Sequence, residues 1–166
     1  MNDRSAASTD ADEMLTESAL SESTLPESVG RFVERTDPEL LCRIETAADR
    51  VVNTWPGESV SDPSAVREPF ADTLADLGVP SRACTLIESV TDRFGLEPVA
   101  SPVPAPPYVV VTTGGVVLRS TLADGRLVME LAAFEVRTQP SRAYERRDEV
   151  AVTAQIIDRE TGHDRR

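Results

Sequence analysis

The segment 111–117, VTTGGVV, is the first stretch whose residue types could do chemistry, because glycine loops that follow strands often bind phosphate groups. Such a loop needs a helix directly after the glycines, so that the backbone N–H groups at the helix N-terminus face the anion. Here the glycines are followed by alternating, β-branched residues without a lysine, and the spacing fits neither GxxxxGK[ST] nor GxGxxG. The pattern therefore predicts a tight β-hairpin at Gly114-Gly115.

Acid–base catalysis would need paired carboxylates in an apolar setting. Asp72 and Asp76 are four residues apart, but the helical pattern around them places both on the solvent side. His163 is the single histidine and lies in a polar stretch close to the end of the sequence, which disfavours a nucleophile relay. Cys42 and Cys84 lack metal-ligand spacing; we expect Cys84 in the core, and leave open whether Cys42 is a reactive thiol. We therefore expect no catalytic, cofactor-binding or metal-binding residue.

A cluster of arginines forms the most positive stretch of the chain. Arg137, Arg142, Arg146 and Arg147 lie within eleven residues, with Tyr144 among them. Four phosphate contacts would lose roughly four decades of affinity between about 0.2 M and 3 M salt, so nucleic acid is a poor candidate partner if the protein works in brine. We expect either a solvated loop with local ion pairs or a site for a protein partner, whose carboxylates suit the arginine fork.

Three other residues are candidates for lining a pocket between helices and sheet: Trp55, Cys84 and Tyr108. Such a pocket would make the protein a small-molecule-binding domain or a small enzyme. Trp55, the only tryptophan, could equally seal the end of the core.

The overall charge indicates the environment. The chain has 29 acidic and 17 basic residues, a net charge of −12, and every basic residue is an arginine. A dense carboxylate surface keeps a protein soluble in brine, where the Debye length falls to roughly 3 Å at 1 M salt. These features resemble cytosolic proteins of salt-accumulating halophilic archaea. The first residues lack the apolar region of a signal peptide and no run is long enough to span a membrane, so we expect a cytoplasmic protein.

Composition also divides the chain. The negative charge lies in the first two thirds, whereas residues 108–166 carry nine acids and nine arginines. The sequence predicts an acidic disordered tail (1–25), one α+β domain (26–158) and a polar C-terminal tail (159–166). The domain comprises a helical part (26–95), a proline-rich connector (98–107) and a sheet (108–158).

Caps and periodicity predict the elements of that domain. Proline at a first helical position, aspartate caps and terminal glycines give four helices: Pro26 to Thr36, Pro38 to just before Trp55, Pro63 to Gly78, and Pro80 to Gly95. Alternating residues give four strands: 108–113, 116–122, 126–137 and 149–157. No helix signal interrupts the strands, so we expect an antiparallel four-stranded meander with the helices packed on one face.

Two turn signals predict the register of this meander. Two-residue loops at Gly114-Gly115 and Asp124-Gly125 give the pairs Val111–Leu118, Leu122–Leu127 and Arg119–Glu130. Both turns place the same residues on one buried face: Val109, Val111, Val116, Leu118, Leu122, Leu127, Met129 and Leu131.

The third strand loses its alternation at Ala132-Ala133. A bulge there would return Phe134 and Val136 to the buried side. The opposite face is only partly polar, and we expect a helix, the connector or a second copy to cover it; it carries Tyr108, Val110, Thr112, Val117, Thr121 and Val128.

The run from Pro106 to Val128, of the form PPYVVVT…VLR.TL.DGRLV, resembles a family of small uncharacterised haloarchaeal proteins. The resemblance covers this one hairpin region. It implies a halophilic origin and carries over no functional residues, because that family has no assigned activity.

These observations favour a non-catalytic protein-interaction or self-association module over an enzyme. The uncharged sheet face and the arginine cluster would contact a protein partner or a second copy, since an uncharged surface on an acidic protein suits contact. A pocket-bearing ligand-binding domain or small enzyme is the alternative.

Overall fold

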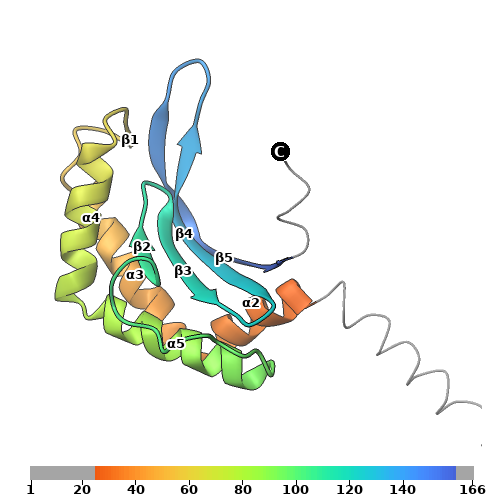
Figure 1. Ribbon diagram of the computed structural model, residues 1–166. Helices are drawn as coiled ribbons and strands as arrows, with labels where there is room; N and C mark the ends of the chain where they lie inside the picture. The colour runs from red at the N-terminus through yellow and green to blue at the C-terminus, as the bar shows by residue number, and fades with distance from the viewer. Residues whose placement is uncertain (1–24, 160–166) are drawn as a thin grey trace, which may run out of the picture.

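A computed structural model describes residues 25–159, which form four helices and one five-stranded antiparallel sheet (Figure 1). The helices are α2 (Leu25–Thr36), α3 (Pro38–Val52), α4 (Ser64–Asp76) and α5 (Val79–Arg93). The strands are β1 (Ser59–Val60), β2 (Val109–Val111), β3 (Gly115–Thr121), β4 (Gly125–Arg137) and β5 (Ala143–Asp158), in the spatial order β1-β5-β4-β3-β2. The helices pack on one face of the sheet. The α+β class is confirmed, with five strands where the sequence pattern predicted four.

The helices begin and end close to the predicted signals. The Asp37 side chain caps α3 by accepting a hydrogen bond from the Leu40 N–H at 3.1 Å, and Pro38 occupies the first turn. Asp62 accepts from the Ser64 N–H at 2.9 Å at the start of α4. Gly78 separates α4 from α5 with a φ of 70°, a conformation that glycine adopts without strain.

The core lies between the helical stripes and the inner face of the sheet. Phe70 of α4 and Phe134 of β4 meet edge to face with ring centroids 5.0 Å apart, and the Trp55 ring lies 5.9 Å from Phe134. The remaining large, fully buried side chains come from both layers: Leu40, Ile44, Leu74, Leu86, Ile87, Leu118, Leu127, Met129, Leu131, Val29 and Val33. Helices and sheet therefore share one core.

Both hairpin turns lie one residue earlier than predicted. The Thr112 N–H donates to the Gly115 carbonyl at 2.8 Å, and the Leu122 N–H donates to the Gly125 carbonyl at 2.9 Å. The two-residue loops are thus 113–114 and 123–124. Each pairing is offset by two residues, which gives Val111–Val116, Ser120–Leu127 and Leu118–Met129. The predicted cross-strand pair of Arg119 and Glu130 is wrong, since Val128 lies opposite Arg119 and Val117 opposite Glu130.

Close strand contact explains the displaced turns. A Cβ on Gly115 would lie 2.1 Å from the Leu131 carbonyl oxygen, and one on Gly125 would lie 2.3 Å from that of Ile157. Gly115 and Gly125 are therefore the first residues of β3 and β4, at points where the neighbouring backbone leaves no room for a side chain. Because the offset is two residues, every side chain keeps its predicted face.

The predicted bulge is present and is tied to the first hairpin. The register of β4 against β5 shifts between Ala132 and Phe134, and the N–H groups of Ala133 and Phe134 both donate to the Gly114 carbonyl, at 2.9 and 3.0 Å. Phe134 returns to the core as expected, but Val136 is 42 % exposed. Beyond the bulge β4 and β5 form a hairpin that projects past the rest of the sheet (Figure 1), so Val136 has less to pack against.

This projecting hairpin and the residue that follows it, called the arm below, comprise residues 134–147. The sequence pattern predicted a loop up to residue 148, but β5 begins at Ala143 and pairs with the far end of β4. The fifth strand, β1, pairs with the arm through Ser59–Glu145 and Val60–Tyr144. Charged residues in 145–149 hide the alternating pattern that would have indicated these strands.

Candidate functional site

The arm carries the four arginines of the cluster that the sequence showed, and two of them form ion pairs within the described chain. Arg137 Nη2 lies 3.0 Å from Glu145 Oε2, and Arg146 Nε lies 2.6 Å from Asp49 Oδ1 on α3. Arg142 and Arg147 make no ion pair with a residue in 25–159. The arm arginines therefore include two that already bind carboxylates of the same molecule.

Tyr144 is not accessible to a partner. Its side chain is 3 % exposed, and it lies between Val60 of β1 and Val136 of β4 in the sheet. The strand that replaces the expected loop turns this ring into the core. The sequence pattern placed Tyr144 on a loop beside the arginines, whereas the structure places it in a strand with its side chain buried.

The three pocket candidates have separate surroundings. Trp55 packs against Phe134 and donates its indole N–H to the Ala65 carbonyl at 3.3 Å. Cys84 is buried on α5, and burial, followed by the nearby Glu88 charge, raises the pKa of its thiol. Tyr108 instead lines a hollow on the side of the sheet away from the helices. The structure does not gather these residues around one pocket between helices and sheet.

The other residues considered for catalysis or metal binding do not form a cluster in the described chain. Cys42 is exposed on α3, and Asp72 and Asp76 are exposed on α4 as predicted. Among residues 25–159, no group of three or more histidine, cysteine, aspartate or glutamate side chains is arranged to hold a metal ion. His163 lies outside the described residues.

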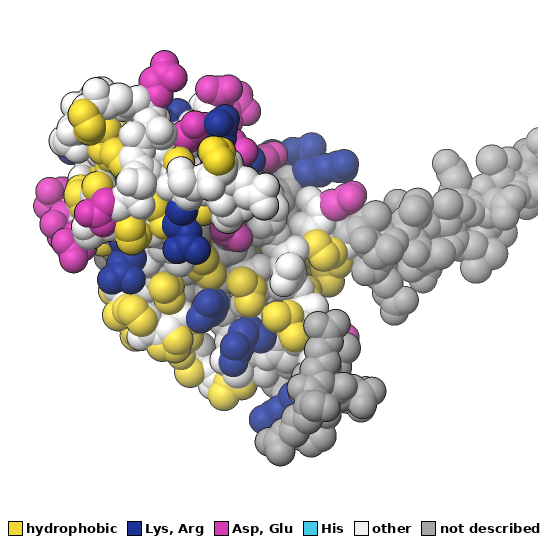
Figure 2. Space-filling view, turned by 90° about the horizontal axis from the view of Figure 1, so that it is seen from above, with side chains coloured by type: hydrophobic (Ala, Val, Ile, Leu, Met, Phe, Trp, Pro, Cys, Tyr) yellow, Lys and Arg dark blue, Asp and Glu magenta, His cyan; other side chains and the backbone are white. Residues whose placement is uncertain are grey.

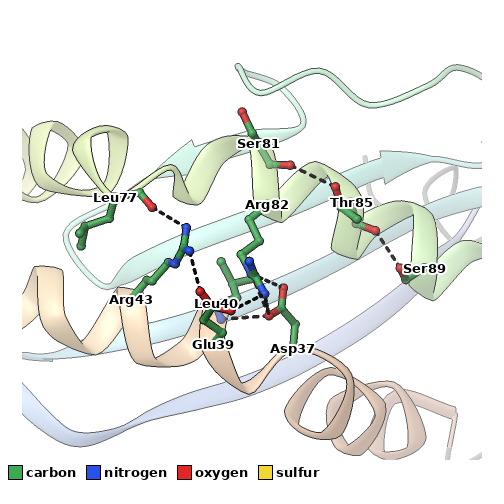
Figure 3. Close-up of polar contacts among 9 residues, drawn as sticks. All are labelled: Asp37, Glu39, Leu40, Arg43, Leu77, Ser81, Arg82, Thr85 and Ser89. Carbon is green, nitrogen blue, oxygen red and sulfur yellow. Dashed lines mark hydrogen bonds and ion pairs between the residues drawn. The ribbon is translucent and has the colours of Figure 1, made fainter.

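The most connected polar cluster joins α3 to α5 (Figure 3). Arg82 Nε donates to both carboxylate oxygens of Asp37 at 2.9 Å, and its Nη2 lies 3.0 Å from Glu39. Arg43 reaches from Glu39, at 2.6 Å, to the Leu77 carbonyl at 2.8 Å. These contacts connect the N-terminus of α3 with α5 and with the end of α4.

A hollow of about 510 Å³ adjoins this cluster, and several of its polar side chains already have partners. The Thr85 and Ser89 hydroxyls donate to carbonyls one turn earlier on α5, at 3.4 and 2.9 Å (Figure 3). Arg82 already binds the two carboxylates of Asp37 and Glu39. We interpret the cluster as a structural clamp.

The contacts of the clamp affect the pKa of Glu39. Its hydrogen bond from Arg43, and next the charge of Arg82, hold the pKa of Glu39 below its ordinary value. The lowered pKa adds stability that is complete above the ordinary pKa of glutamate and is lost as pH falls through the lowered pKa. Arg43→Met should raise the Glu39 pKa towards its ordinary value in an NMR carboxyl titration.

Arg50→Met is the matched control, because Arg50 lies on the same helix and makes no ion pair with a described residue. It should leave the Glu39 pKa unchanged. An equal shift in both variants would show that the general field of the helix, and not the Arg43 contact, sets this pKa.

The side of the sheet away from the helices, called the outer face below, has a different character. Its half-buried or exposed side chains are Tyr108, Val110, Val117, Arg119, Thr121, Arg126, Val128, Glu130, Thr153, Gln155 and Ile157. Only three of them are charged. Figure 2 shows hydrophobic and arginine side chains interleaved over one part of the molecular surface, with most of the acidic side chains elsewhere.

Two arginines of the outer face converge on a small hollow. Tyr108, Arg119, Thr121 and Arg126, together with Pro107, line a space of about 110 Å³. Arg126 stands directly opposite Thr121 on the neighbouring strand. Within the described chain, neither arginine forms an ion pair. The hollow therefore offers two guanidinium groups and two hydroxyl-bearing side chains to a carboxylate-sized group.

The alternating sequence pattern indicated the partly apolar character of this face, but it did not single out Arg119 and Arg126 as site residues. The alternation of inward and outward residues along β3 and β4 could have identified both arginines, because each occupies an outward position on its strand. The assumed pairing of Arg119 with Glu130 hid the first of them.

Comparison with known protein families gives a match over most of the chain. A family model described as Domain of unknown function (DUF7988) matches residues 27–157. Neither a curated protein nor a solved structure matches the chain. In the part of the chain that the structure describes, no helix has the length and hydrophobicity needed to cross a bilayer.

Proposed function

Because the chain belongs to the family described as Domain of unknown function (DUF7988), its function has to be inferred from its own surface, and we propose that it is a non-catalytic protein-interaction module. The outer face of the sheet is the binding surface. The partner is a protein segment that offers carboxylates beside apolar side chains. The observation that supports this most is the pair of arginines, Arg119 and Arg126, which stand among valines without a carboxylate partner in residues 25–159.

The composition of the outer face suits a protein contact. Arginine and aromatic residues are enriched at interface centres, where other charged residues are depleted. Val110, Val117 and Val128 would supply the apolar part. Each exposed ion pair alone contributes only about 0–1 kcal/mol, so the valines have to contribute as well. An acidic segment without apolar residues should therefore bind weakly.

The arm is a poorer candidate for the main contact. Two of its arginines are paired within the molecule, and its tyrosine is buried. Arg142 and Arg147 are free to add peripheral contacts, and they provide charge-matched control positions. We extend the proposal to the setting: a net charge of −12 without lysine supports a cytoplasmic protein of a halophilic archaeon.

The test is a comparison of partner capture by three full-length proteins in ~3 M KCl, a brine in which long-range charge effects are screened. Arg119→Glu/Arg126→Glu should lose proteins that the wild type retains, whereas Arg142→Glu/Arg147→Glu, with the same charge change on the arm, should keep them. Capture that survives the outer-face variant would exclude this surface.

Light scattering of the same proteins addresses self-association. A mass that doubles with concentration in the wild type, and stays monomeric only in the outer-face variant, would make a second copy the partner. It would contradict the proposed acidic segment.

A further inference from the structure

We propose that the outer face is occupied in the free protein by the acidic N-terminal segment of the same molecule, residues 10–20, which a partner has to displace. This inference rests on the proposed function, because it assigns a competitor to the same surface. The occupant is identified by its chemistry and by the place where it joins the described fold.

The segment has the chemistry that the outer face requires. Residues 1–24 carry six carboxylates and one arginine. Residues 10–20 contain both acidic and large apolar side chains: Asp10, Asp12, Glu13, Met14, Leu15, Glu17 and Leu20. The outer face offers the complement, since Arg119 and Arg126 lie within reach of Val117 and Val128 on adjacent strands. Carboxylates can thus meet guanidinium groups while Met14 and Leu15 cover valines.

The segment joins the fold beside this face. It leads into α2 at Leu25, and Pro26 and Glu27 line a hollow of about 440 Å³ together with Thr153 and Ala154 of β5. Thr153 itself belongs to the outer face, opposite Glu130 of β4. The chain therefore enters α2 at the margin of the proposed surface.

The distance to the arginines is short compared with the length of the segment. Arg126 lies one strand across from β5 and four residues along β4 from Glu130. With strands about 4.8 Å apart and about 3.4 Å per residue, Arg126 is roughly 15 Å from Thr153. About five extended residues span that distance. Leu20 is five residues before Leu25, so the acids that precede it can reach both arginines.

Covalent attachment lets a weak contact persist. Attachment through only a few residues gives an effective concentration in the mM range, so a segment with a dissociation constant near ~1 mM would occupy the face for about half of the time. A partner would then bind with an affinity reduced by the occupied fraction. Removing the carboxylates of the segment should strengthen partner capture.

The experiment is a paramagnetic relaxation measurement on the full chain. A nitroxide is attached at Ser18→Cys in a Cys42→Ser background, because Cys42 is exposed and Cys84 is buried. We expect broadened backbone amide signals at Val117, Arg119 and Val128, and unchanged signals at Arg67 and Glu88, which are exposed on α4 and α5. Equal, weak broadening everywhere would overturn the inference.

Two variants and a mixed sample sharpen the measurement. The full-length variant D10N/D12N/E13Q/E17Q should lose the broadening, whereas R142S/R147S on the arm should keep it. In a mixture of spin-labelled protein and isotope-labelled protein without the label, broadening should be absent. Broadening seen only in that mixture would assign the contact to a second copy and contradict docking within one molecule.

The two proposals can fail separately. If the nitroxide leaves the outer face unaffected while capture still depends on Arg119 and Arg126, the surface binds partners and the segment does not regulate it. If the segment docks but no capture depends on these arginines, the outer face serves the chain's own tail and the proposed function is wrong.

Discussion

Gly115→Ala is expected to destabilise the protein by about 3 kcal/mol or more, near the upper end of the cost of overpacking a core. The added methyl group would lie 2.1 Å from the Leu131 carbonyl oxygen and 2.9 Å from the Ala132 Cα. Both are backbone atoms of the neighbouring strand, so no side-chain rotation relieves the overlap. β3 and β4 would have to separate at the position that also holds the bulge. Urea unfolding of the purified variant measures the loss.

Gly114→Ala is the matched control for this substitution. A Cβ at Gly114 meets only side-chain oxygens, of Glu130 at 3.6 Å and Thr112 at 3.7 Å, which are ordinary contacts. We expect a cost of about 1 kcal/mol or less. Equal losses in the two variants would show that the turn conformation, and not contact between strands, requires the glycines.

Phe134→Ala is expected to cost about 3–5 kcal/mol, the usual range for removing a buried phenylalanine. Its ring is 2 % exposed and touches both Phe70 and Trp55, so the cavity would open at the junction of α4 with the sheet. Thermal unfolding and the near-ultraviolet signal of Trp55 should report the change together.

Val136→Ala provides the comparison, because Val136 lies two residues further along the same strand and is 42 % exposed. A change within about 0.5 kcal/mol is expected, as for most surface substitutions. If Val136→Ala costs as much as Phe134→Ala, the arm is packed against something that the fold of one chain does not supply.

Much of the fold could be predicted from the sequence because its signals are local. Asp37-Pro38 and the glycine at 78 determine helix ends through hydrogen bonds and backbone angles of a few neighbouring residues. The register depended on which residues of each glycine-containing turn form the loop. That choice is decided by the approach of the Leu131 and Ile157 carbonyls, which belong to strands later in the chain. The faces were nevertheless correct, because an offset of two preserves alternation.

The candidate site was harder to predict than the fold. The arm arginines are close together in sequence, and this made them conspicuous, but Arg146 is paired with Asp49 from α3. Arg119 and Arg126 are separated by a turn, and only the pairing of β3 with β4 brings them to one hollow. Tyr144 became a core residue because β1, a strand of two residues, pairs beside it. Such short strands carry almost no periodic signal.

The order of the strands has a consequence for assembly. In the described chain β2 is three residues long, and β1 covers only Tyr144 and Glu145 of β5. Along the rest of β5 helices lie at the border, since Glu45 of α3 accepts from the Val150 N–H and Gly30 of α2 lies beside the Val152 carbonyl. Growth of the sheet by adding strands side by side, the geometry of fibrils, has little to start from at these borders. A crowded solution of this protein should therefore resist amyloid-like aggregation.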